Sequence, residues 1–402
     1  MSAPERDPVI ELFGRLYAPD DRGLSMVRVE DGVITSIAPA SAPTAGALGG
    51  HGWRIVPGLL DIQLNGAFGH DFADPAADLG LVGRGLPRFG VTGYVPTIVT
   101  SAPAAYGPAL ANLRRRTQPG EARPLGAHLE GPCLSPRHPG THDPALLRAP
   151  DVTEARSWLE GGDVRYVTLA PEIPGALPLI AFLADRGVRV SMGHTDATWA
   201  EAEAAVAAGA SQATHLFNAM RPLRHRDPGI AGFVLATHLP AGVIADGHHL
   251  AFEMLRVVVR AKGPDEAFLV TDGLSGLGLP PGTYRLANRE YVSDGTVGRL
   301  ADGTLSGSLL PLNRALRNLV DRVGLEPAQA VRMATLNPAR TLGLDGSLGR
   351  IEVARTADVV LLDESWEVQA TIIGGRLAYA ADGGNPGAAF AWRLPVPGSE
   401  GG

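Results

Sequence analysis

Cysteine and lysine are almost absent from this sequence. Cys133 is the only cysteine among 402 residues, which excludes an internal disulfide and any cysteine-rich metal site and fits a reducing compartment. Lys262 is the only lysine. A Schiff-base lysine, or a carboxylated lysine bridging two metals, would therefore have to be Lys262. Lys262 ends a predicted helix and precedes the next strand, which is the wrong end of a strand for chemistry, so we set both mechanisms aside.

Long hydrophobic runs and basic runs are also lacking. No stretch approaches the roughly 20 consecutive apolar residues that a membrane helix needs. The start, MSAPERDPVIELFG, has acids where a signal peptide would have basic and then apolar residues. A net charge of −7 without a basic cluster argues against nucleic acid as the main partner. We therefore expect a cytoplasmic protein that binds neither membrane nor nucleic acid.

The composition and its changes along the chain predict two domains. With 402 residues, 45% hydrophobic and 19% charged, the chain can bury a large core. Residues 8–56 contain short alternating or β-branched runs broken by proline, glycine and aspartate, and a pattern of short strands returns from about residue 345. We expect residues 1–56 and 345–402 to form one small β-sandwich domain, and residues 57–344 to form the main domain.

The main domain alternates apolar strands with alanine-rich helices. Strands are expected near residues 59–65, 92–99, 125–130, 164–172, 188–194, 211–218, 241–247 and 267–273. Eight such units are the number in an α/β fold of the (β/α)₈, or TIM-like, barrel type. The clearest helix lies between the fifth and sixth strands, with an N-cap in the region of Thr195, Asp196 and Thr198 and with Gly209 after its last turn.

Four ionisable residues lie at the ends of these strands. Glu130, His194, His215 and Asp272 each end a short apolar run, so a parallel barrel brings them to the same rim. Two imidazoles and one carboxylate are the ligand set of an open catalytic site for one divalent metal, with zinc first and iron, cobalt or manganese also acceptable. We expect Glu130, His194 and His215 to bind this metal.

Asp272 has a separate expected role. It ends the apolar strand AFLVTD, where an unpaired acid would be costly. A carboxylate beside the metal can take a proton from the attacking water and later deliver it to a leaving group. The alternative is that Asp272 only hydrogen-bonds a ligand histidine.

The sequence contains an ordered set of short motifs: IVPGLLDIQLNG (55–66), HLEGP (128–132), GTHDP (140–144), GHTDAT (193–198), THLFNAM (214–220), DPGIAG (227–232), IADGHH (244–249), VTDG (270–273), LSGS (305–308) and MATLNPAR (333–340). Together these motifs resemble the N-acetylglucosamine-6-phosphate deacetylases of the amidohydrolase superfamily. The resemblance implies an enzyme that hydrolyses the acetamide of N-acetyl-D-glucosamine 6-phosphate to D-glucosamine 6-phosphate and acetate. It also implies a homodimer, with the phosphate site completed across the dimer interface.

The sequence departs from the superfamily pattern after the first strand. Two histidines spaced by one residue usually occur there, and this chain has Gln63 and Asn65. Neutral amides are poor metal ligands, so we expect one metal, and we expect these amides to stabilise the barrel mouth.

The same resemblance assigns the remaining site residues. It implies that His142 polarises the scissile carbonyl and stabilises the oxyanion. It also implies substrate contacts by Asn218, Ala219, Arg226, His249 and Leu305. The choice among Arg221, Arg224, His225 and Arg226 as the phosphate ligand stays open, with the motif favouring Arg226. His138 is expected to be a surface loop residue.

Three other functions remain to be weighed. A deacetylase for N-acetylgalactosamine 6-phosphate would carry the same motifs. An N-acyl-amino-acid deacylase or a cyclic amidase would not need the arginine-containing loop and usually keeps the paired histidines. A catalytically inactive relative that binds a sugar phosphate or a protein would have no use for the four strand-end residues.

Overall fold

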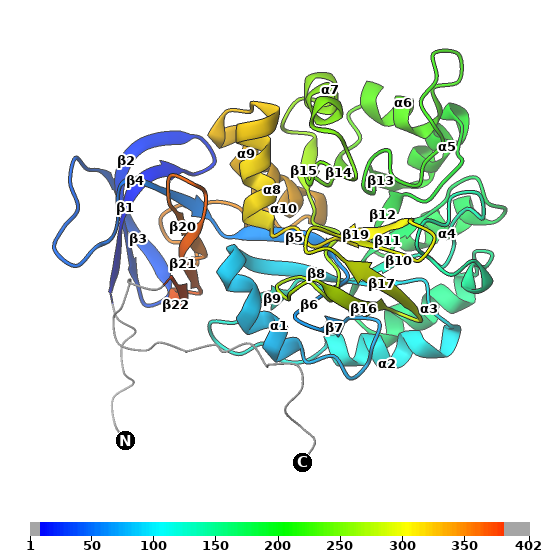
Figure 1. Cartoon of the computed structure of the whole chain (residues 1–402), viewed down its shortest axis with the longest axis horizontal. Coiled ribbons are helices and arrows are strands. Elements are labelled where there is room, and N and C mark those ends of the chain that lie inside the picture. Colours follow the sequence, from blue (N-terminus) through cyan, green and yellow to red (C-terminus); the bar gives the residue numbers. More distant parts are fainter. Residues whose placement is uncertain (1–8, 382–402) are drawn as a thin grey trace.

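The computed structural model describes residues 9–381. A barrel makes up the larger lobe, and the two ends of the described chain meet in a smaller β lobe beside it (Figure 1). This arrangement confirms the expected fold class. Among the described residues, no helix is long and apolar enough to cross a membrane.

All eight predicted barrel strands are present. Their bounds are β5 (Leu59–Leu64), β8 (Val91–Val99), β10 (Ala127–Glu130), β11 (Val164–Leu169), β12 (Arg189–Met192), β13 (Ala210–Ala213), β14 (Ala241–Val243) and β15 (Ala267–Leu269). They pair in parallel in the order β5-β8-β10-β11-β12-β13-β14-β15. A parallel bridge from Leu64 to Gly273 joins β5 to the segment after β15 and closes the barrel.

Five strands end two or more residues earlier than expected. The prediction extended strands through His194, His215 and Asp272, but β12, β13 and β15 stop two or three residues before these positions, and β11 and β14 stop at Leu169 and Val243. The cause is local: His194, His215 and Asp272 have φ angles of 48°, 27° and 48°, in the left-handed region that interrupts a strand. The chain turns at the rim where the site residues lie.

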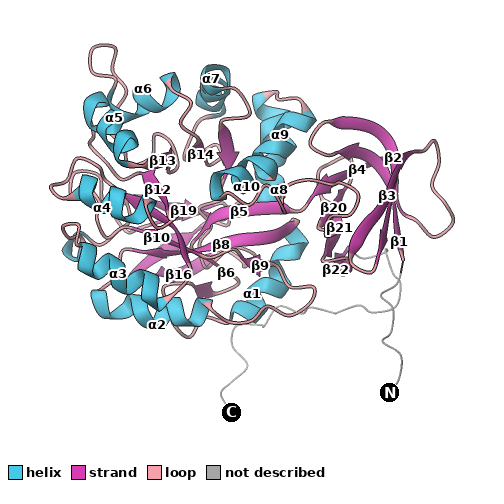
Figure 2. Ribbon diagram, turned by 180° about the vertical axis from the view of Figure 1, so that it is seen from behind, coloured by secondary structure: helices cyan, strands magenta, loops and turns pink. Residues whose placement is uncertain are grey.

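Helices surround the strands (Figure 2). They are α1 (Leu79–Gly85), α2 (Pro103–Leu113), α3 (Val152–Gly161), α4 (Ala176–Ala184), α5 (Trp199–Ala208), α6 (Gly229–Ala236), α7 (Phe252–Lys262), α8 (Leu312–Asn318), α9 (Pro327–Ala334) and α10 (Leu336–Leu342), with shorter helical segments η1 (Leu86–Phe89), η2 (Pro144–Leu146) and η3 (Leu319–Val323). The predicted caps of α5 are confirmed: Thr198 forms a capping box with Glu201, and Gly209 is left-handed.

The smaller lobe is a seven-stranded sheet. Its strands are β1 (Ile10–Tyr17), β2 (Asp21–Glu30), β3 (Val33–Pro39), β4 (Leu48–Pro57), β20 (Val359–Leu362), β21 (Val368–Ile373) and β22 (Arg376–Ala380), in the order β22-β21-β20-β4-β1-β2-β3. Side chains from both ends of the chain share one apolar core there, separate from the barrel core. We propose domain boundaries at residues 56/57 and 344/345; residues 1–8 and 382–402 lie outside the described part.

Short strands extend the barrel rim. β16 (Gly282–Leu286), β17 (Arg289–Ser293), β18 (Val297–Arg299) and β19 (Leu305–Ser308) form an antiparallel sheet, and β6 (Gly66–Ala67) pairs with β7 (His70–Asp71). β9 (Arg123–Pro124) pairs with β8. The β16–β19 sheet was not predicted, and it places Leu286, Leu305 and Ser306 in the wall of a cavity at the carboxyl ends of the barrel strands.

Candidate metal and active site

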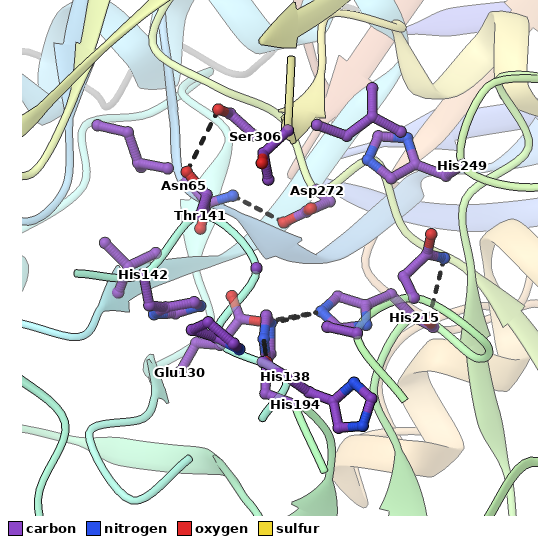
Figure 3. Close-up of a pocket in the computed structure, with 18 of the residues that line it drawn as sticks. Asn65, Glu130, His138, Thr141, His142, His194, His215, His249, Asp272 and Ser306 are labelled. Atoms are coloured by element: carbon purple, nitrogen blue, oxygen red, sulfur yellow. Dashed lines mark hydrogen bonds and ion pairs between the residues drawn. The ribbon is translucent and has the colours of Figure 1, made fainter. Parts of the chain in front are cut away.

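The predicted site residues meet in one cavity of about 450 Å³ (Figure 3). Nine of them line it: Glu130, His142, His194, His215, Asn218, Ala219, His249, Asp272 and Leu305. Arg226 does not line the cavity and is exposed in the loop that precedes α6. The cavity therefore unites the predicted metal ligands, the proton-transfer carboxylate and most of the predicted substrate contacts.

Glu130, His194 and His215 form a compact donor cluster. Each offers one ligand atom, and the three atoms lie within 4.8 Å of one another. Glu130 Oε1 is 3.2 Å from His194 Nε2 and 3.0 Å from His215 Nε2, and the two Nε2 atoms are 3.1 Å apart. Two imidazole nitrogens and a carboxylate oxygen that converge in this way suit a divalent cation.

The imidazole of His194 is oriented for ligation. Its Nδ1 donates to the backbone carbonyl of His138 at 3.0 Å, which leaves an Nε2 lone pair toward the cluster. Burial tends to raise the pKa of Glu130, but the two neighbouring histidines hold it well below its usual value. Glu130 is therefore ionised and could bind a cation.

His142 has a defined tautomer. The backbone N–H of Thr100 donates to His142 Nδ1 at 3.3 Å, and the Thr100 hydroxyl lies 2.9 Å from the same nitrogen. A backbone N–H can only donate, so Nδ1 is an acceptor and Nε2 carries the proton. Burial lowers the pKa of His142 to about 3. The site thus contains a neutral imidazole whose remaining N–H can donate to an oxygen.

Asp272 is buried and lines the same cavity (Figure 3). Its Oδ1 accepts hydrogen bonds from Asn65 Nδ2 at 2.7 Å and Gln63 Nε2 at 3.2 Å. Burial and the charge of Glu130 raise its pKa. A carboxylate with a raised pKa beside a metal site can hold a proton and release it.

The substrate side of the cavity is built around His249. Its Nδ1 donates to Asp246 Oδ2 at 2.6 Å, and both side chains are almost fully buried. Asn218 Nδ2 donates to the carbonyl of His215 at 3.1 Å, which ties a predicted substrate contact to a predicted metal ligand. Arg221 is paired with Asp227 at 2.7 Å, which occupies one of the loop arginines.

Sequence reasoning missed several cavity residues. His138, expected on a surface loop, lines the cavity, and its ring is 3.1 Å from Asp196. Arg137 also lines the cavity and pairs with Asp196 at 2.7 Å. Thr141 and Ser306 face each other across it at 3.2 Å. No motif marks His138 or Arg137, because their positions depend on how the loop after β10 folds back.

Known proteins are similar to this chain in both sequence and fold. The amidohydrolase family matches residues 55–378. The human N-acetylglucosamine-6-phosphate deacetylase is 41% identical over 82% of this chain and 85% of its own length. The N-acetylgalactosamine-6-phosphate deacetylase of Escherichia coli O157:H7 is 37% identical over 88% of this chain and 94% of its own length.

Solved structures of similar proteins have the same fold as this chain. An N-acetyl-D-glucosamine-6-phosphate deacetylase from Mycobacterium smegmatis superposes with a TM-score of 0.85 at 33% identity, covering 92% of this chain and 99% of that one. An enamidase of the amidohydrolase superfamily, at 14% identity and a TM-score of 0.60, shares the fold. The chain therefore belongs to the amidohydrolase family and, within it, to the N-acetylglucosamine-6-phosphate deacetylases.

Proposed function

We propose that this protein hydrolyses the acetamide of N-acetyl-D-glucosamine 6-phosphate, releasing D-glucosamine 6-phosphate and acetate in amino-sugar catabolism or recycling. The observation that carries this proposal is the meeting of a Glu-His-His cluster, a neutral histidine donor and a buried carboxylate in one cavity. The similarity to deacetylases from several organisms supports the same reaction. An inactive relative would have no use for this set of buried ionisable groups.

Glu130, His194 and His215 would hold one divalent metal, which we propose to be zinc. When bound, such a cation polarises a carbonyl and lowers the pKa of a water. Gln63 and Asn65 do not provide a second metal site, because both donate to carboxylates. The only lysine, Lys262, donates instead to the carbonyls of Val234 and Thr237.

Asp272 would move the proton. As the water oxygen attacks the amide carbon, one water proton passes to the Asp272 carboxylate and the carbonyl π electrons move to the oxygen. The electrons on that oxygen then re-form the carbonyl as the C–N bond breaks, and the proton on Asp272 passes to the departing nitrogen. The immediate products are an amine and acetic acid, which ionises to acetate in water, and Asp272 returns to its ionised form.

His142 would stabilise the oxygen on which negative charge develops. Its Nε2–H is available because Thr100 occupies Nδ1. A neutral donor of this kind needs no reorganisation when the oxyanion forms.

The sugar phosphate would be held by residues farther from the metal. We propose contacts by Asn218, Ala219, His249 and Leu305, which line the cavity. Arg226 lies outside the cavity of its own subunit, so we propose a homodimer in which Arg226 reaches the partner's phosphate site. Sedimentation at several concentrations tests the dimer, because a monomer of 41.9 kDa would contradict it.

A second substrate has a specific observation in its favour. The Escherichia coli O157:H7 relative, named for N-acetylgalactosamine 6-phosphate, is nearly as similar as the human enzyme. The two sugars are epimers, which differ only in the configuration of one hydroxyl group. We rank N-acetylglucosamine 6-phosphate first because it is the substrate in the names of most of the similar enzymes.

Acetate release from a panel of N-acetyl hexosamines tests the proposal. The panel contains the gluco and galacto epimers, each with and without the 6-phosphate. The metal content of the enzyme preparation is measured as well. We expect the highest kcat/KM for N-acetylglucosamine 6-phosphate; equal use of unphosphorylated sugars would contradict the phosphate contacts. We also propose a cytoplasmic location, which fits the single, buried cysteine.

A further inference from the structure

The first barrel strand is unusually polar for its position. All six residues of β5 (Leu59–Leu64) are buried, and a strand buried on both faces is normally apolar throughout. Asp61, Gln63 and Asn65 nevertheless follow one another at every second position. Alternate residues of a strand share a face, so all three side chains project to the same side. Burying three polar groups is costly unless each has a partner.

All three side chains find partners in the segment that closes the barrel after β15. Asp61 Oδ2 accepts from the Thr271 hydroxyl at 2.5 Å. Gln63 and Asn65 both donate to Asp272 Oδ1, at 3.2 and 2.7 Å. The backbones are joined as well, since the Asp272 N–H donates to the Gln63 carbonyl at 3.0 Å.

The two amides form hydrogen bonds to only one of the two carboxylate oxygens of Asp272. Both N–H donors converge on Oδ1, and no donor among residues 9–381 contacts Oδ2. The carbonyl oxygens of both amides are buried without partners, so their N–H groups alone are matched to the carboxylate. Gln63 also donates to Glu130 Oε1 at 3.3 Å, whereas Asn65 contacts only Asp272 among the charged site residues.

We propose that Gln63 and Asn65 are positioning residues that clamp Oδ1 of Asp272 and leave Oδ2 as the oxygen that exchanges the proton. The proposal rests on the proposed function for the role of Asp272. It explains why neutral amides occupy these positions: a carboxamide remains a donor at any pH, whereas a neutral imidazole donates only from one nitrogen.

Asn65→Ala tests the clamp, because Asn65 does not touch the metal cluster. We expect kcat to fall about 10- to 100-fold, the usual loss for a residue that orients a catalytic group, with KM and metal content unchanged. In a double-mutant cycle, Asn65→Ala should cause no further loss in an Asp272→Asn background, since it acts through Asp272. A rise in KM, or equal losses in both backgrounds, would overturn the proposal.

Asn337→Ala is the matched control. Asn337 is also a buried carboxamide with two short hydrogen bonds, to the carbonyls of Pro264 and Ala267, both at 2.7 Å. Its loss should lower stability and leave kcat unchanged. If Asn65→Ala does not fold, Asn65→Leu fills nearly the same space without a donor, and it should show the same loss of kcat.

A crystal structure of the metal-loaded Asn65→Ala protein gives a readout that needs no substrate. The Asp272 carboxylate should change its orientation while Glu130, His194 and His215 keep theirs; an unmoved carboxylate would overturn the clamp. If the wild-type protein releases no acetate from any hexosamine phosphate, the proposed function fails, and this structure still decides whether the amides position Asp272.

Discussion

At the scale of single residues, the surroundings give identical side chains different chemical states. Burial lowers the pKa of His142 to about 3, so it is a neutral donor. Burial also opposes the charge on His215, but hydrogen bonding and attraction to Glu130 raise its pKa above the ordinary value. Two carboxyl groups diverge in the same way, since the pKa of Glu130 is lowered and that of Asp272 is raised. Such separation is what assigns ligand, donor and proton carrier in one cavity.

Replacing Asp272 tests its role in proton transfer. Asp272→Asn keeps an oxygen for the two amide donors but cannot take a proton, so we expect kcat to fall about 100- to 10,000-fold with the metal retained. Acetate release and metal analysis of the same preparation check this. Activity near that of the wild type would remove Asp272 from the mechanism.

Asp61 should make stability depend on pH. Burial raises its pKa from the ordinary 3.8 to about 7. The folded state therefore holds the proton more tightly than the unfolded state, and this contribution to stability is present below pH 4 and lost as pH rises toward 7. Asp61→Asn keeps an uncharged side chain there, so its advantage over the wild type should grow by up to about 4 kcal/mol across this range.

The free energy of unfolding in urea, measured at pH 5 and pH 8 for both proteins, checks the effect of Asp61. The difference between variant and wild type cancels the titration of all other groups. Parallel pH profiles for the two proteins would show that Asp61 does not titrate as its burial requires.

At the scale of elements, the helices and turns between strands determine where each functional group lies. α5 follows His194 and leads to β13, after which His215 occurs. Its start is fixed by a reciprocal pair, in which the Thr198 N–H donates to Glu201 Oε2 at 2.8 Å and the Glu201 N–H donates to Thr198 Oγ1 at 3.4 Å. The helix therefore begins a few residues after a proposed metal ligand.

Removing the cap of α5 should weaken folding without changing the site. Thr198→Ala should lower the free energy of unfolding by about 1 kcal/mol, because a first-turn N–H loses its acceptor. Chemical denaturation checks the loss, and metal content should be unchanged. Thr198→Ser keeps the oxygen and is the control; an equal loss in both variants would show that the methyl group, and not the cap, matters.

At the scale of the whole molecule, the metal site joins distant parts of the barrel. Glu130 ends β10, His194 follows β12 and His215 follows β13. A cation bound to all three stabilises the folded state, because the unfolded chain cannot bring these ligands together. The same rim carries the β16–β19 sheet, where Asn288 Nδ2 donates to Asp143 Oδ2 at 2.7 Å, next to His142.

Metal removal should therefore lower the melting temperature. At a free metal concentration of a thousand times the Kd, binding contributes about 4 kcal/mol. Chelation should lower Tm, and added zinc should restore it, as followed by differential scanning fluorimetry. His194→Ala should lose this response; an unchanged Tm on chelation of the wild type would contradict a metal held by these three ligands.

Sequence pattern predicted most of the barrel for a local reason. Each strand is a short apolar run and α5 has its own caps, so β5, β8 and α5 could be placed from neighbouring residues alone. The early ends of β12, β13 and β15 could not, because His194, His215 and Asp272 take left-handed φ angles that are uncommon for residues other than glycine, and the sequence does not mark them. The β16–β19 sheet was missed because its short strands follow a glycine- and proline-rich stretch that gives no strong periodicity.

The sequence by itself determined the fold class and the types of group available for chemistry, because hydrophobic periodicity and the scarcity of lysine and cysteine act through composition and short-range order. Only the tertiary structure decided which groups act together. It turned Gln63 and Asn65 toward Asp272, set the tautomer of His142 through Thr100, and left Arg226 outside the cavity. These relations join residues far apart in the chain, and hydrogen-bond geometry between them exists only once the barrel has closed.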